Sequence, residues 1–349
     1  VLIMKLIKAN VVDDYARKIS SDPDTPTGLH FTHLPSQEDV AAGKPTNAFE
    51  YVVSLRDSVR RVVSDLIDGG TRVGALVLGM FCTSFIDVAG EFDIPAYVFF
   101  SSGGSSLGMI THLVSPKFDG GVNLKQYKNS DEELNIPVFS VPVPAKVFPS
   151  VLVQDFPFSS AVLTAFRRLS EVKGIMVNTF HELESYAIET LGSDETFPKI
   201  YPVGPVLNLG DNEEKHGGGS GEEIKKWLDN QPENSVVFLC FGSMGSFEAP
   251  QVSEIAAALE NTGTRFLWSL RKPPGKDSTG MRFPTEYDDF EDVLPEGFLE
   301  RTQGIGKVIG WAPQAAVLSH PAVGGFVSHC GWNSILESIW FGVPVATFP

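Results

Sequence analysis

The sequence predicts an α/β protein that is built from two domains with parallel sheets. The chain has 349 residues, which is enough for two domains of roughly 150 residues each. Short β-branched runs alternate along it with segments of helical periodicity. One polar, glycine-rich stretch interrupts this alternation. We therefore expect an N-terminal domain over 1–208, a linker over 209–222 and a C-terminal domain over 223–349.

The individual strands are predicted by short runs of β-branched and aromatic residues. In chain order they are 1–7, 29–34, 73–81, 96–100, 174–179, 235–241, 266–270, 307–309, 323–327 and 344–348. Between them, apolar residues recur with helical spacing, most clearly over 49–67 and 335–341. Apolar strands that alternate with helices are typical of doubly wound parallel sheets covered on both faces. Such sheets bind ligands at the carboxyl ends of their strands.

The composition is acidic, with 27 Lys and Arg against 43 Asp and Glu, and the formal net charge is −16. Such a surface repels nucleic-acid phosphates and anionic lipids, so we expect neither as a partner. No apolar run reaches the ~18 residues of a membrane span. Cys82, Cys240 and Cys330 lack metal-ligand spacing, which favours free thiols in a reducing compartment and no metal site. We expect a monomeric, cytoplasmic protein.

Both ends of the sequence have the pattern of buried strands, with VLIM at the start and VATFP at the end. Chain termini usually lie frayed at the surface, outside regular elements. We therefore interpret the sequence as a fragment of a longer chain.

The common nucleotide-binding signatures are absent from the sequence. It contains neither GxGxxG after a strand nor GxxxxGK[ST]. A dinucleotide-dependent oxidoreductase is therefore supported only by the fold class. The segment Ser101–Gly108 follows a strand but lacks the P-loop lysine. We interpret it as a strand-to-helix turn that lines the ligand cleft.

A strand–turn–helix segment near the end of the chain predicts an anion site. Gly331 permits a tight turn, after which the N–H groups of Trp332, Asn333 and Ser334 begin a helix. First-turn amides and the positive end of the helix dipole suit a diphosphate. The side chains of His329 and Ser334 can donate further hydrogen bonds to phosphate oxygens.

Residues for a ribose and a base lie close to this turn in the sequence. Glu337 comes one helical turn after Asn333 and therefore shares its helix face. A carboxylate there can accept hydrogen bonds from ribose hydroxyls. Trp311 opens a separate loop, where its ring could stack on a base, and Ala312 and Gln314 could contact the base edge.

The segment Trp311–Pro349 resembles the signature box of the plant family-1 UDP-dependent glycosyltransferases, which act on small secondary metabolites. Four further segments resemble the same family, namely Phe81–Pro95, Gly174–Glu184, Ser235–Ser246 and Leu294–Thr302. The resemblance is greatest to members that act on flavonoids and related phenolics. It implies a GT-B fold, in which two Rossmann-like domains face each other across a cleft. The N-terminal domain would bind the acceptor and the C-terminal domain the UDP-sugar.

The resemblance also gives a role to each residue of the predicted site. Trp311 would stack on uracil, Ala312 and Gln314 would contact the base and ribose region, and Glu337 would hold the ribose hydroxyls. The residues implied at the diphosphate are Ser243, His329, Asn333 and Ser334, with Gly331 in the turn and Trp332 beside the sugar phosphate. No metal and no cofactor are implied. The co-substrate would be a UDP-sugar, with UDP-glucose the usual one.

The catalytic residues depart from the family pattern. The family's base is a histidine in the first strand-to-helix loop, and Val1 resembles the family's second strand. We therefore expect the position of this histidine to lie before Val1, so that the catalytic base is not identified in this sequence. Gly79 stands where the family has the aspartate that orients this histidine. The sequence also ends before the residues of the signature box that contact the sugar hydroxyls. The identity of the donor sugar therefore does not follow from this sequence. We therefore expect the fragment itself to be inactive.

Two hypotheses follow for the function. The first is an inverting O-glycosyltransferase that moves a sugar, by default glucose, from a UDP-sugar to a phenolic or flavonoid-like hydroxyl. The second is a UDP-binding paralogue with impaired catalysis, because glycine can neither fix the tautomer of an imidazole nor stabilise its protonated form.

Overall fold

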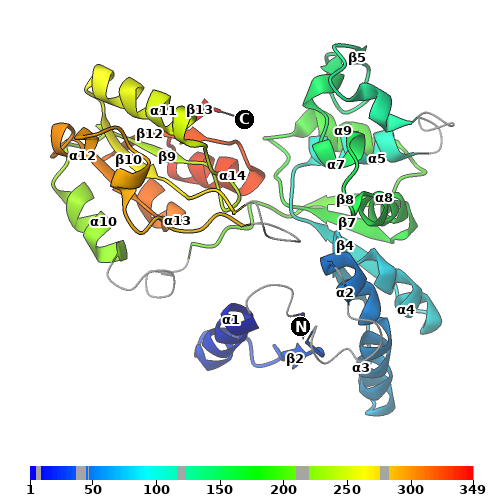
Figure 1. The fold of residues 1–349 in the computed structure, drawn as a ribbon. Coiled ribbons are helices and arrows are strands. Elements are labelled where there is room, and N and C mark those ends of the chain that lie inside the picture. Colours follow the sequence, from blue (N-terminus) through cyan, green and yellow to red (C-terminus); the bar gives the residue numbers. More distant parts are fainter. Residues whose placement is uncertain are drawn as a thin grey trace. The chain divides into compact units, whose positions relative to one another are not determined.

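The computed structural model describes residues 1–4, 9–36, 45, 47–115, 123–209, 220–275 and 283–348. The chain divides into two compact units, Val1–Pro205 and Val206–Pro349, whose elements are labelled in Figure 1. Of the predicted linker, residues 210–219 lie outside the described residues, and residues 220–222 begin a helix.

The first unit is organised around a four-stranded parallel sheet with the strand order β3-β4-β7-β8. Its strands are β3 (Leu76–Gly79), β4 (Ala96–Phe100), β7 (Gly174–Val177) and β8 (Lys199–Pro202). Two small sheets accompany it, the parallel pair β1 (Leu2–Ile3) and β2 (Thr32–His33) and the antiparallel pair β5 (Glu133–Leu134) and β6 (Val143–Pro144). The parallel α/β class that the sequence predicts is confirmed for this unit, and β5, β6 and β8 are additions to the predicted strands.

Most helices of the first unit pack their apolar residues onto this sheet to form one continuous core, namely α2 (Ala48–Ser54), α3 (Arg56–Asp68), α4 (Ile86–Glu91), α5 (Gly104–Val114), α7 (Ser150–Val153), α8 (Ser159–Arg167) and α9 (Ser185–Ser193). The unit also contains α1 (Ala9–Ser21). Short 3₁₀ turns join them at Thr83–Phe85, Leu124–Tyr127, Ala145–Val147 and Arg168–Glu171.

The prediction of one helix over 49–67 is wrong, because the segment forms the two helices α2 and α3. The chain tightens at Leu55, whose N–H bonds to the carbonyl of Val52 three residues back. The Leu55 side chain is completely buried at this junction. Packing of one leucine, rather than a glycine or proline, therefore sets the break.

The second unit contains a five-stranded parallel sheet with the order β11-β10-β9-β12-β13. Its strands are β9 (Val236–Cys240), β10 (Arg265–Ser269), β11 (Gly306–Ile309), β12 (Val323–Ser328) and β13 (Val345–Thr347). Its helices are α10 (Ser220–Asp229), α11 (Ala249–Thr262), α12 (Phe298–Arg301), α13 (Gln314–Leu318) and α14 (Trp332–Phe341), with a 3₁₀ turn at Phe290–Asp292. Each strand predicted for this half is present, with bounds that differ by a residue or two.

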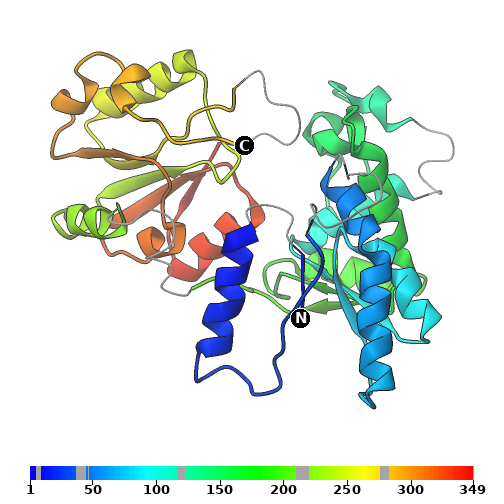
Figure 2. The same cartoon turned by 60° about the horizontal axis from the view of Figure 1, so that its bottom comes forward.

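Both faces of this second sheet are covered, as the nearly continuous apolar runs of β9 and β10 require. Alternate side chains point to opposite faces. Phe238 and Leu267 join the core under α10, α13 and α14, whereas Leu239, Phe266 and Trp268 join the core under α11 and α12. Figures 1 and 2 show these two groups of helices on opposite sides of the sheet. The unit is therefore doubly wound.

Candidate functional site

The predicted site residues gather at one edge of the second sheet. The parallel register places Cys240 beside Ser328 and Ser269 beside Ile309, so four neighbouring strands end at the same level. The loops that follow these strand ends carry Ser243, Trp311 and the segment that begins at His329. This is the edge where open parallel sheets bind ligands.

His329 is held between the backbones of two glycines. A Cβ added at Gly242 would lie 2.6 Å from His329 Nε2, and one added at Gly331 would lie closer still. Gly242 also has a φ of +75°, in the region that glycine adopts readily. Both positions therefore require glycine if the imidazole is to keep its place.

The imidazole of His329 is half-buried, and burial lowers its pKa below the usual histidine range. The ring is therefore neutral near pH 7 and has one N–H to donate. Among the described residues, no atom partners its buried Nδ1. A neutral donor at this point can hydrogen-bond to a phosphate oxygen without adding a buried charge.

Helix α14 begins immediately after this histidine. Its N-cap is Gly331, which has no side chain to occupy the first-turn amides. Cys330, with a φ of +62°, turns the chain, and its N–H donates a hydrogen bond to Ser328 Oγ at 3.1 Å. The N-cap residue therefore does not cap these amides with a side chain of its own, and a helix start of this kind can bind an anion.

The corresponding helix start in the first unit is occupied differently. At the start of α5, Glu184 accepts hydrogen bonds from the N–H groups of Gly104 at 2.7 Å and Ser105 at 2.8 Å. The predicted strand-to-helix turn is present there. Because a carboxylate of the chain itself takes those amides, this helix start is not an anion site.

One hydrogen-bonded group joins three of the predicted residues. Gln314 Nε2 donates to Glu337 Oε2 at 2.7 Å and to Ser334 Oγ at 3.0 Å. Burial raises the pKa of Glu337, and the hydrogen bond from Gln314 opposes that rise. Ser334 and Glu337 therefore face Gln314 from the same side of α14, and the sequence alone did not indicate that Gln314 orients both.

The remaining predicted residues surround this group. The residue Trp311 is 39% exposed, Ala312 is buried, and Ser243 and Asn333 are exposed. Trp332 is half-buried at the start of α14. Ser269 Oγ donates to the carbonyl of Gly310 at 2.7 Å and thereby fixes the loop that carries Trp311.

Sequence reasoning missed Arg271 as a member of this site. Its guanidinium carbon lies 5.2 Å from the centre of the Trp311 ring. The two residues come from different loops, which follow adjacent strands β10 and β11. The only sequence signal was a basic residue just beyond the predicted strand 266–270.

The first unit contributes an aromatic cluster formed by segments that are distant in the sequence. Phe81, just after β3, lies edge-on to Phe49 with ring centres 5.4 Å apart, and Phe49 stacks on Phe158 at 5.9 Å. Phe156 stacks on Phe158 at 5.4 Å. Phe81 and Phe156 are more than one-third exposed. These rings therefore form a partly exposed aromatic surface.

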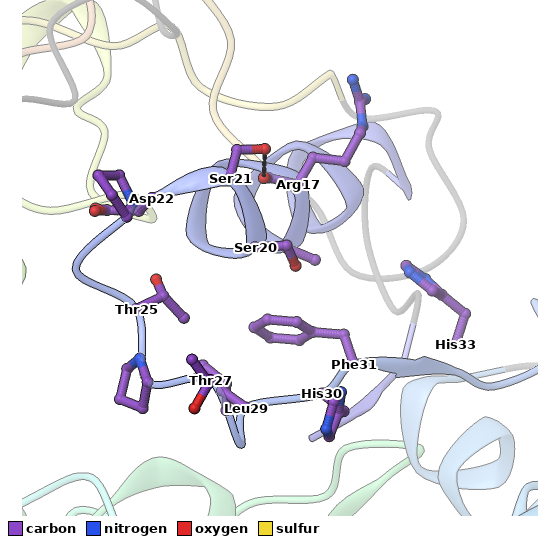
Figure 3. Close-up of a pocket in the computed structure, with 13 residues that line it drawn as sticks. Arg17, Ser20, Ser21, Asp22, Thr25, Thr27, Leu29, His30, Phe31 and His33 are labelled. Carbon is purple, nitrogen blue, oxygen red and sulfur yellow. Dashed lines mark hydrogen bonds between the residues drawn. The ribbon is translucent and has the colours of Figure 1, made fainter.

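A second feature of the first unit is a pocket of about 620 Å³ between α1 and the chain that leads into β2. Figure 3 shows Phe31 pointing toward its interior, with His30 and His33 on the β2 side. His33 Nδ1 lies 3.1 Å from Asp13 Oδ1. None of the predicted nucleotide-site residues lines this pocket.

The described part of the chain lacks two further features, a metal-binding cluster and a membrane-spanning helix. No group of three or more His, Cys, Asp or Glu residues in these ranges has the arrangement of a metal site. No helix in these ranges combines the length and apolar character that crossing a bilayer requires.

The second unit thus has the architecture of an α/β protein in which neighbouring strand ends carry the residues predicted to contact a diphosphate, a ribose and a base. A family model for UDP-glucoronosyl and UDP-glucosyl transferases matches residues 146–349. The chain is 50% identical to a putative UDP-glucose flavonoid 3-O-glucosyltransferase of Fragaria ananassa over 97% of its length and 71% of that protein. It is 52% identical to an anthocyanidin 3-O-glucosyltransferase of Manihot esculenta over 86% of its length and 75% of that protein.

Solved structures give the same result. A UGT transferase from Siraitia grosvenorii in complex with UDP matches with a TM-score of 0.86 and 45% identity, over 94% of this chain and 70% of that one. Medicago truncatula UGT71G1 complexed with UDP-glucose matches with a TM-score of 0.82 and 37% identity, over 100% of this chain and 72% of that one. The chain belongs to the UDP-glycosyltransferase family and has the GT-B fold. It is a glycosyltransferase with a UDP-sugar as co-substrate, and the alternative of an impaired UDP-binding paralogue gains no support.

Proposed function

We propose that this protein transfers glucose from UDP-glucose to a hydroxyl group of a flavonoid-like phenol. The observation that carries the proposal is the convergence of His329, Ser334, Gln314 and Glu337 at the strand ends of the second unit. The names of the Fragaria ananassa and Manihot esculenta relatives supply the sugar and the acceptor class.

In this proposal the nucleotide is bound in three parts. Trp311 stacks on uracil, with Ala312 and Gln314 at the base and ribose, and Glu337 accepts from the ribose hydroxyls. The diphosphate is bound by the first-turn amides of α14 and by four side chains. These are Ser243, His329, Asn333 and Ser334, with Gly331 forming the turn and Trp332 beside the sugar phosphate.

The acceptor is proposed to bind against the aromatic cluster of the first unit. Phe81 and Phe156 each expose more than one-third of their surface. A phenylalanine that served only to fill the core would be buried, so these two rings are available to a ligand. Aromatic rings stack favourably on a phenolic ligand, with about 0.5–1.5 kcal/mol for each well-placed pair.

The chemical step is a single displacement. A base removes the proton of the phenolic hydroxyl, the oxygen attacks the anomeric carbon, and the bond to the UDP oxygen breaks with inversion. Charge develops on the leaving diphosphate. Donors that are already in place at the start of α14 and on His329 stabilise that charge without reorganisation.

Because we expect these 349 residues alone to lack the base, the direct test uses a chain that includes the family's first strand-to-helix loop. It is incubated with UDP-glucose and a panel of hydroxylated flavonoids, and products that carry one added hexose are measured by chromatography and mass spectrometry. We expect a product with at least one flavonoid. Glu337→Ala should lose most of this activity, whereas Glu291→Ala, at an exposed position in a 3₁₀ turn, should retain it. No transfer from any UDP-sugar to any phenol would contradict the proposal.

The Gln314–Glu337 hydrogen bond predicts a particular pH dependence. Only the ionised carboxyl group accepts from both ribose hydroxyls, so UDP affinity should fall as the pH falls through the pKa of Glu337. Removal of Gln314 deletes the hydrogen bond that lowers this pKa, and burial then raises it further. In Gln314→Ala the loss of affinity should therefore begin at a higher pH than in the wild type. Titration of UDP binding between pH 4 and 8 measures both midpoints.

The control for this experiment is Gln303→Ala. Gln303 is exposed in the turn before β11, and its substitution leaves the hydrogen bonds of Glu337 intact. Its midpoint should match the wild type. Equal midpoints for Gln314→Ala and the wild type would show that the hydrogen bond does not control ionisation of Glu337.

We further propose that the protein is a cytoplasmic monomer. Its three cysteines are free thiols, two of them buried, which fits a reducing compartment. Light scattering after size-exclusion chromatography should give the mass of one chain. A mass of two chains, or a fluorescent fusion that is retained in the secretory pathway, would contradict this.

A further inference from the structure

Arg271 lies against the ring that is proposed to stack on the base. Its guanidinium carbon is 5.2 Å from the centre of the Trp311 ring. The Arg271 side chain is only 12% exposed. A cation over a tryptophan face is attracted by the electrons of the ring, and the attraction grows as the cation loses water.

Arg271 is also fixed in orientation by its other contacts. Nη2 donates to the carbonyl of Pro284 at 2.9 Å, and Nε donates to the carbonyl of Thr285 at 3.3 Å. The carboxylate of Glu286 lies 3.4 Å from Nε. The segment that supplies these acceptors is itself held by two backbone hydrogen bonds between Lys272 and Thr285, at 2.9 and 3.0 Å.

The same carboxylate connects this assembly to the loop of the tryptophan. A Cβ at Gly310 would collide with Glu286 Oε2, so the carboxylate lies directly against the backbone of Gly310. Gly310 immediately precedes Trp311. The loop is therefore supported by Glu286 from one side, by the Ser269 hydroxyl through the Gly310 carbonyl, and by Arg271 at the ring.

The buried side chain of Arg271 also carries an energetic cost. Nη1 of Arg271 is buried, and no atom among the described residues partners it. An unpaired donor on a charged group is unfavourable. A lysine or a neutral side chain would avoid this cost, but neither would present a flat, fixed cation to the ring.

We infer that Arg271 is a positioning residue, which, together with Glu286, sets the plane of the Trp311 ring and thereby the affinity for the base of UDP. The inference rests on the proposed function, because it takes uracil as the ring that stacks on Trp311. Arg271 touches the tryptophan and acts through it. Its effect should therefore appear in binding of the nucleobase and be absent from binding of the diphosphate.

The experiment compares Arg271→Gln with Arg265→Gln in the purified protein. Arg265 is the first residue of β10, whereas Arg271 follows the other end of that strand. Arg265 donates to Gln231 Oε1 and to the carbonyl of Gly304. Arg271→Gln should weaken UDP binding about 3- to 30-fold and raise the KM for UDP-glucose equally, with kcat unchanged. Arg265→Gln should leave both constants at the wild-type values. The inhibition constant of inorganic pyrophosphate, which has no base, should be the same in all three proteins.

A double-mutant cycle identifies the route of the effect. In a Trp311→Leu background, Arg271→Gln should cause no further loss of UDP affinity, because the ring through which it acts is gone. Glu286→Gln, at a half-exposed side chain, should weaken UDP binding in the same direction and by less. It provides the test if Arg271→Gln fails to fold.

The outcomes separate the two proposals. If the wild type binds UDP and Arg271→Gln binds it equally well, the inference is overturned and the proposed function stands. Equal losses of UDP and pyrophosphate affinity, or additive losses with Trp311→Leu, would also overturn it. A wild type that binds no UDP would overturn both proposals.

Discussion

Replacing Gly331 with alanine is expected to weaken UDP binding about 10- to 100-fold while the protein remains folded. The new Cβ would lie too close to His329 Nε2 for a non-bonded contact, so the imidazole must shift from its place between the two glycines. A hydrogen bond to a charged group contributes about 1.5–3 kcal/mol, which corresponds to this range. Gly331 has a φ of −57°, so alanine adds no backbone strain and the effect comes from the side-chain collision. Calorimetric titration with UDP measures it.

The matched control is Gly325→Ala, on the strand β12 that leads into this turn. The nearest atom to a Cβ at Gly325 is Val237 Cγ2 at 3.7 Å, which is an ordinary contact. This variant should bind UDP like the wild type. Thermal unfolding of both variants separates folding from binding, since overpacking at Gly331 is expected to cost about 1–3 kcal/mol of stability. Wild-type affinity in Gly331→Ala would remove His329 from the diphosphate site.

The fold was predictable where one local pattern determined each element. The runs that became β4 and β9 are apolar throughout, because both faces of a parallel strand are buried. The strand β8 was not predicted. Its sequence, Lys199-Ile-Tyr-Pro202, has a lysine and a proline at its ends, as suits the edge strand that it is. Edge strands have less burial to mark them in the sequence.

The site was predictable as a set of residues, but its internal contacts were not. The order His329, Gly331, Ser334 fixes a turn and a helix start through local geometry alone. By contrast, Gln314 reaches Glu337 across 23 residues of sequence, and Arg271 reaches Trp311 from another loop. Such contacts depend on which strands are neighbours in the sheet. No local pattern records that arrangement.

In a chain that includes the family's catalytic histidine, replacing Gly79 with aspartate is expected to raise kcat by about 10²-fold, the lower end of what general acid–base assistance provides, with UDP affinity unchanged. The resemblance places the orienting aspartate of the catalytic histidine at this position. The structure has room for it, because Gly79 is the exposed last residue of β3 and a Cβ would lie 3.8 Å from its nearest neighbour, Cys82 Sγ. Burial raises the pKa of the Cys82 thiol to about 11, so the thiol stays neutral beside the new carboxylate.

The comparison with Gly79→Asn identifies the cause of any gain. Asparagine has nearly the same shape but no charge, so it can accept a hydrogen bond from an imidazole without stabilising the imidazolium. Of the two variants, only Gly79→Asp should bring the large gain in kcat in the chain that includes the catalytic histidine. It should also move the acidic limb of the pH–rate profile to higher pH, because a neighbouring negative charge raises the pKa of an imidazole that must be neutral to accept a proton. Equal kcat values for the two variants would show that charge at this strand end does not assist the base.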